Sequence, residues 1–105
     1  MLQQNSFPTK EWHLENMKKT IVKYVAGLLD NSTFDIRHHN KYGGNLMWVH
    51  KRVTTDIKHG VTVGEILDFL DKIRSSNEFA DLRNKEGSLE RLDLMKIHFS
   101  TPMPY

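Results

Sequence analysis

A chain of 105 residues is long enough for one hydrophobic core and too short for two, and the absence of cysteine excludes disulfide frameworks, thiolate metal sites and cysteine nucleophiles. With 38% hydrophobic and 27% charged residues, the composition is that of a folded domain and excludes wholesale disorder. The formal net charge is only +2, but residues 37–59 hold five basic residues against one acid, whereas residues 60–93 hold eight acids against five bases.

The N-terminal region shows no targeting signal, because it lacks a basic segment followed by an apolar stretch. The longest apolar cluster, Ile21 to Leu29, is interrupted by Lys23 and is far too short to cross a membrane. We therefore expect a cytoplasmic protein without a membrane partner. We expect one domain over residues 1–105, with residues 1–8 and 100–105 as extended tails.

An apolar stripe predicts a long first helix over residues 10–29, with Thr9 as its N-cap. Its apolar residues recur at spacings of three and four: Leu14, Met17, Ile21, Tyr24 and Leu28. The stripe widens in the second half of the helix. Such a helix lies at the centre of the core or also supplies a dimer contact, so a homodimer through residues 10–29 is one expectation.

Residues 46–59 fit either a strand or a helix. As a strand they are rich in β-branched residues, but as a helix they carry Asn45 as an N-cap and Gly60 just beyond the last turn. Because both ends carry helix signals, we favour a helix here.

Residues 62–73 carry the clearest local signal in the chain. Thr62 and Glu65 have the spacing of a capping box, and Val61 and Ile66 stand in the positions of a hydrophobic staple. The serines and asparagine at 75–77 end this helix or cap a short helix that carries Phe79 and Leu82, and residues 84–87 form a turn.

Two segments alternate in the manner of β-strands. They are Phe34, Ile36 and His38, which precede a predicted turn over residues 40–45, and Met95, Ile97 and Phe99 near the C-terminus. The predicted fold class is therefore α+β: a small single domain with a long N-terminal helix, two further helices and a small sheet that includes the C-terminal strand.

A helix, Gly60 and a capped helix also outline a helix-turn-helix motif. A helix that reads the major groove needs Arg, Lys, Asn or Gln at its first exposed positions. Those positions hold Val63, Gly64, Leu67, Asp68 and Asp71 instead. We therefore interpret this helix as a core-packing element with a solvated acidic face.

The sequence carries no nucleophile elbow, phosphate-binding loop or zinc-helix spacing, and we expect no cofactor and no metal. His38 and His39 are adjacent, so on a strand they would point to opposite faces and could not easily chelate one ion. We expect a small non-enzymatic binding protein, a regulator or inhibitor that occupies the surface of another macromolecule, a protein in the first place, through charged faces. An accessory protein of a bacterium or phage fits this description.

The predicted contacts lie on two sides of the molecule. They are Arg37, His39, Lys41, Trp48, Lys51 and Arg52 on the basic side, and Glu65, Asp68 and Asp71 on the acidic side. One alternative is RNA or single-stranded nucleic-acid binding through residues 37–52, where cations alternate with Tyr42 and Trp48. A second alternative is a small metal-independent ribonuclease that uses His38, His39, His50 and Tyr42.

Overall fold

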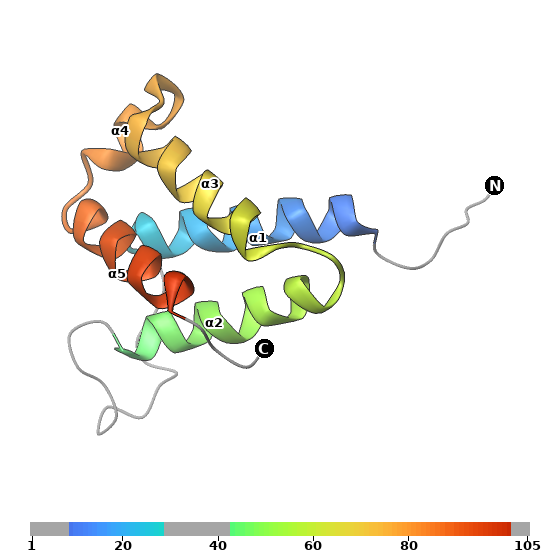
Figure 1. Cartoon of the computed structure of the whole chain (residues 1–105). Coiled ribbons are helices and arrows are strands. Elements are labelled where there is room, and N and C mark those ends of the chain that lie inside the picture. Colours follow the sequence, from blue (N-terminus) through green and yellow to red (C-terminus); the bar gives the residue numbers. More distant parts are fainter. Residues whose placement is uncertain (1–8, 29–42, 102–105) are drawn as a thin grey trace.

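The protein is described by a computed structural model over residues 9–28 and 43–101 (Figure 1). These two ranges form helices, turns and short connections. The helices are α1 (Lys10–Val25), α2 (Gly43–Lys58), α3 (Val63–Ser75), the 3-10 helix η3 (Asn77–Phe79), α4 (Ala80–Arg83) and α5 (Ser88–Ser100).

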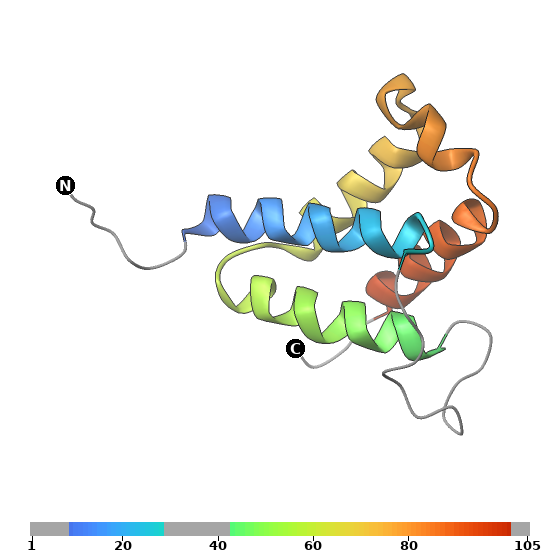
Figure 2. The ribbon, with the colours of Figure 1, turned by 180° about the vertical axis from the view of Figure 1, so that it is seen from behind.

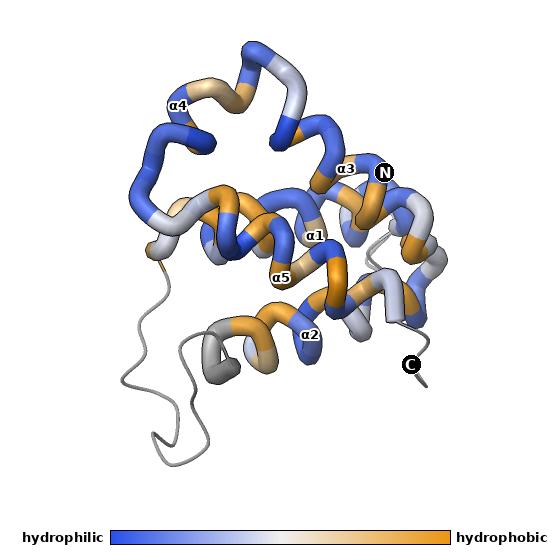
Figure 3. The backbone as a smooth tube through the Cα atoms, turned by 60° about the vertical axis from the view of Figure 1, so that its left-hand side comes forward, coloured by the Kyte–Doolittle hydropathy of each residue, from blue (hydrophilic) through white to orange (hydrophobic). Residues whose placement is uncertain are grey.

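The helices are arranged as two antiparallel pairs. α1 and α2 lie side by side, and α3 and α5 form the second pair, joined through η3 and α4 (Figures 1 and 2). α5 also contacts α1, which brings the two pairs together. Each long helix alternates hydrophilic and hydrophobic segments along its length (Figure 3), so each can bury one side and expose the other.

One hydrophobic core is built from all four long helices. Its fully buried members include Met17 and Ile21 of α1, Val53 of α2, Ile66 of α3 and Met95 of α5. Burying side chains of this size contributes about 1.5 to 3 kcal/mol each to the free energy of unfolding. The core therefore holds both helix pairs together.

The α+β prediction is wrong, because residues 9–28 and 43–101 contain no β-strand. The expected C-terminal strand lies within α5. Leu92, Met95 and Phe99 follow a helical spacing and are each at most 2% exposed, whereas Ile97 is 65% exposed. A strand would have placed Met95, Ile97 and Phe99 on one face. The other expected strand, residues 34–38, lies outside the described residues.

Several local sequence signals for helices are confirmed. Thr9 caps α1 by accepting from the Trp12 N–H at 3.2 Å, and the capping box of α3 is confirmed in both directions. The helical interpretation of residues 46–59 is also confirmed, although α2 begins at Gly43, within the segment expected to turn. Gly60 follows it with a φ of +108°, a conformation that costs glycine little.

The structure refines the predicted boundaries at the end of α1 and at the short helices after α3. α1 ends at Val25 rather than at residue 29, and Gly27 follows with a φ of +74°. The short helix carrying Phe79 and Leu82 is confirmed as η3 and α4, with Ser76 as the cap of η3. Arg91 links α5 to the C-terminal end of α1, because its Nε donates to the Val25 carbonyl at 3.0 Å.

Candidate functional site

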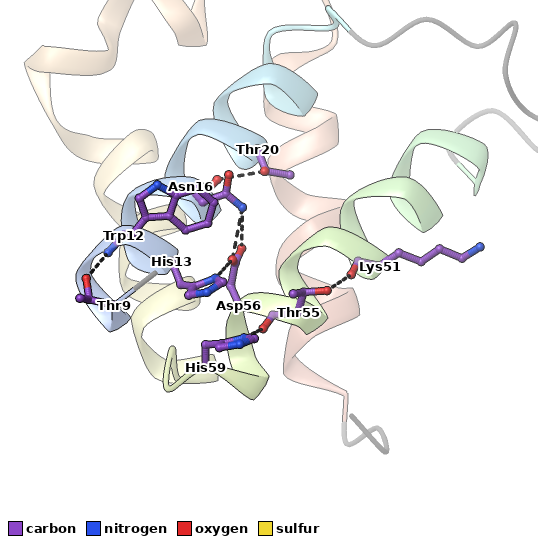
Figure 4. A network of polar contacts seen from close by, with 9 residues as sticks. All are labelled: Thr9, Trp12, His13, Asn16, Thr20, Lys51, Thr55, Asp56 and His59. Carbon is purple, nitrogen blue, oxygen red and sulfur yellow. Dashed lines mark hydrogen bonds and ion pairs between the residues drawn. The ribbon is translucent and has the colours of Figure 1, made fainter. Parts of the chain in front are cut away.

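A buried polar cluster joins α1 to α2 (Figure 4). His13 Nδ1 lies 2.7 Å from Asp56 Oδ1, and Asn16 Nδ2 donates to both Asp56 oxygens at 3.2 and 3.3 Å. Asp56 is fully buried and His13 is 4% exposed. Because a carboxylate only accepts hydrogen bonds, His13 carries its proton on Nδ1 in this contact. The Asp56 carboxylate is therefore held by two donors from the neighbouring helix.

Local helix geometry places these groups opposite one another. His13 and Asn16 are three residues apart and so share one side of α1. Asp56 belongs to the last turn of α2, and His59, the first residue after this helix, lies over the cluster. The rings of His13 and His59 stack with centroids 4.1 Å apart, and His59 Nδ1 donates to the Thr55 carbonyl at 2.9 Å. The cluster is thus covered by a side chain that its own helix end orients.

An open pocket of about 370 Å³ lies against this cluster. Its lining residues are Trp12, His13, Asn16, Arg52, Thr55, Asp56 and His59. Trp12 is 53% exposed, more than is usual for so large a side chain, and its ring meets His13 edge to face with centroids 4.9 Å apart. The pocket therefore has an aromatic and cationic rim over a polar floor.

The exposed side of α2 continues this rim along the helix. Arg52 lies over the Trp48 ring at 4.7 Å from its centroid, and Met47 is 51% exposed. Lys51 is exposed as well. We call this surface the α2 face, and it consists of Trp12, Met47, Trp48, Lys51, Arg52 and His59. The single acid of α2, Asp56, is buried beneath it, so the α2 face itself carries no negative charge.

The structure brings together only some of the predicted contact residues. Trp48, Lys51 and Arg52 share the α2 face, whereas Arg37, His39 and Lys41 lie outside the described residues.

The acidic contacts are on α3, away from the α2 face. Glu65 caps α3, and the Thr62 backbone N–H, followed by other nearby groups that include Lys10, lowers the pKa of its carboxyl. Lys10 Nζ lies 3.4 Å from Glu65, and Lys96 Nζ lies 3.7 Å from Asp71. Asp68 is exposed beside Lys18 and Lys72. The acidic side is therefore partly neutralised within the chain.

Sequence reasoning missed Trp12, His13 and Asn16, and it did not place Asp56 in a buried polar cluster. A signal was present, because His13 stands four residues before Met17 and Asp56 stands three after Val53, which places both polar residues on the buried stripes. A polar residue on such a stripe needs a partner, since burying an unpaired charge is costly. That pairing across 43 residues of chain appears only in the fold.

The remaining histidines bear on the ribonuclease alternative. His50 Nδ1 lies 2.9 Å from His98 Nε2, and burial, followed by the proximity of His50, lowers the pKa of His98. His38, His39 and Tyr42 lie outside the described residues, so that alternative stays a prediction. Across residues 9–28 and 43–101, no three His, Asp or Glu side chains gather in a way that could hold a metal ion.

In the same part of the chain, no helix has both the length and the apolar character needed to cross a membrane. Comparison with known proteins gives no relative: the chain matches no family, no curated protein and no solved structure.

Proposed function

We propose that the protein is a small non-catalytic binding protein, a regulator or inhibitor, whose α2 face covers an acidic surface on a partner protein. The observation that carries this proposal is the composition of the α2 face. Exposed or half-buried Trp, Met and Arg side chains gather there without an acid among them. These residue types are enriched at the centres of protein interfaces, and Trp and Arg dominate the residues that contribute most to binding.

The side chains of this face are also held in place before a partner arrives. The Arg52 guanidinium lies over the Trp48 ring, and the Trp12 ring meets the buried His13 ring edge to face. The buried contact of Asp56 with His13 holds α1 against α2, so Trp12 and Arg52 keep their spacing. A preorganised surface loses less side-chain entropy on binding, which favours affinity.

The proposal makes a charge-specific prediction. The double variant Lys51→Glu and Arg52→Glu reverses the charge of the α2 face without touching the core, because both side chains are exposed. As the matched control, Lys19→Glu and Lys85→Glu reverse two exposed cations elsewhere, one on α1 and one in the turn before α5. In a pull-down from nuclease-treated lysate, wild type and the control are expected to retain one protein near stoichiometry, and the α2 variant is expected to lose it.

Salt gives a second readout. At about 1 M ionic strength the Debye length falls to about 3 Å, so a contact that depends on Lys51 and Arg52 is expected to weaken strongly. Equal retention by both double variants would contradict the assignment of the interface to the α2 face.

Nucleic acid is the second candidate partner, supported by the exposed Trp12 ring beside Arg52, since bases stack on such rings while cations meet phosphates. It predicts that nuclease treatment removes the bound material and that the purified protein shifts labelled single-stranded RNA.

Light scattering on the same preparation tests the homodimer expected through the first helix. The apolar stripe of α1, including Met17 and Ile21, is already buried within one chain.

A further inference from the structure

A second hollow, of about 520 Å³, lies between α1, α3 and η3 and shares no lining residue with the pocket over Asp56. Its apolar lining consists of Val22 of α1, Phe69 of α3 and Phe79 of η3. The two phenyl rings meet edge to face with centroids 5.7 Å apart. Their contact fixes the shape of the apolar wall, because edge-to-face aromatic pairs are a preferred geometry.

The rim of this hollow carries more positive than negative charge. It holds Lys18, Lys19, Lys23 and Lys72 against Glu15 and Glu78, which leaves a surplus of two positive charges.

The two glutamates are already partnered within the rim. Lys18 Nζ lies 3.5 Å from Glu15, and Lys72 Nζ lies 3.6 Å from Glu78. The surplus charge therefore resides on Lys19 and Lys23. These are four residues apart on α1 and so are neighbours on its surface.

We propose that this hollow binds a small amphiphilic anion. Its apolar chain or ring would lie against Val22, Phe69 and Phe79, and its single carboxylate or sulfonate would lie between the ammonium groups of Lys19 and Lys23. The volume is in the range of small-molecule sites, which run from about 300 to 1,000 Å³. A neutral apolar ligand would leave the two lysines unmatched, and a strongly polar anion would leave the phenyl wall unused.

Lys18 lines the same hollow beside Phe69. Its Nζ lies 5.8 Å from the centroid of the Phe69 ring, within the range of a cation–π contact. The ligand class follows from this combination of an aromatic wall with a surplus of two ammonium groups at one rim.

The test is an amide NMR titration of the full chain with decanoate, below the concentration at which it forms micelles. We expect the largest shifts between Lys19 and Lys23 and at Phe69 and Phe79, with a Kd on the order of 1 mM for a ligand of this size. Decyltrimethylammonium has the same chain with a cationic head and is expected to bind much more weakly.

Variants separate this site from the α2 face. Lys19→Glu with Lys23→Glu is expected to weaken decanoate binding about tenfold, because two attractive contacts become repulsive, and to improve binding of decyltrimethylammonium. The pair Lys19→Arg with Lys23→Arg keeps the charge and should keep the affinity. As a control, Lys51→Glu with Lys58→Glu on α2 should leave decanoate binding unchanged.

Several results would overturn the proposal. These are no decanoate binding, shifts that map to α2, equal binding of both amphiphiles, or equal weakening by the α1 and α2 double variants. A hollow that ignores decanoate but responds to an acidic amphipathic peptide would be a protein-docking groove instead. Because the α2 face shares none of these residues, the two proposals fail independently.

Discussion

Removing the Asp56 carboxylate tests the idea that a buried polar contact joins α1 to α2. In Asp56→Ala, His13 Nδ1 loses its acceptor at 2.7 Å inside the protein, and Asn16 loses two contacts at 3.2 and 3.3 Å. Hydrogen bonds to a charged group contribute about 1.5 to 3 kcal/mol each, and the Asp56 carboxylate accepts from two side chains. We expect the free energy of unfolding to fall by about 3 to 6 kcal/mol.

Urea denaturation followed by circular dichroism measures this loss. Since domains of this kind are stable by about 5 to 15 kcal/mol, this loss removes a large share of the stability and should move the urea midpoint far below that of wild type. Asp68→Ala removes an exposed carboxylate and is the control, with an expected change within about 0.5 kcal/mol. The double variant with His13→Ala should show a coupling of about 1 to 3 kcal/mol. A loss below about 1 kcal/mol for Asp56→Ala, or strict additivity with His13→Ala, would refute the reasoning.

Three further predictions concern other buried or constrained groups. The buried Tyr24 hydroxyl has no hydrogen-bond partner in the described part of the protein, so Tyr24→Phe is expected to raise the free energy of unfolding by about 1 kcal/mol at neutral pH. Burial raises the pKa of Tyr24 to about 12, above its ordinary value near 10. Wild type should therefore lose stability as the pH rises from about 10 to about 12, while denaturation of Tyr24→Phe should show no such loss. Burial lowers the pKa of His98, so its contribution to stability is complete above about pH 6.5 and is lost as the pH falls below that value. His98→Gln should flatten this dependence in urea titrations, and an unchanged slope would count against it. Gly87 has a φ of +78°, and an added Cβ would lie 2.6 Å from Arg91 Nη1, so Gly87→Ala should lower the free energy of unfolding by about 1 to 2 kcal/mol. An added Cβ at Gly64 on α3 would make only an ordinary van der Waals contact with Thr62 Oγ1 at 3.8 Å, so Gly64→Ala should instead raise it by about 0.5 to 1 kcal/mol, and the same sign for both variants would contradict the account.

The sequence predicted helix ends correctly where the end depends on residues close to it in the chain. The caps at Thr9 and Thr62 could be predicted because in each a side-chain oxygen accepts from a backbone N–H only three residues away. The C-terminal strand was mistaken because Met95 and Phe99 satisfy an alternating and a helical spacing equally well. The burial of Leu92, one turn earlier, and the exposure of Ile97 distinguish the two, and both depend on how the neighbouring helices pack.

The candidate site divides in the same way. Trp48, Lys51 and Arg52 were predicted from their clustering in one basic segment. Trp12 and His13 were not, because nothing near them in the chain indicates that α2 will lie alongside.

The sequence by itself determined the elements that depend on contacts within a few residues. These are the caps, the amphipathic stripes of α1 and α3, the glycine after α2 and the concentration of cations in the middle of the chain. The tertiary structure decided that residues 88–100 form a helix, that His13 meets Asp56, and that Trp12 stands beside Arg52. The physical reason is range: hydrogen bonds within one helix are set by neighbouring residues, whereas the partner of a buried side chain is set by how whole helices pack against one another.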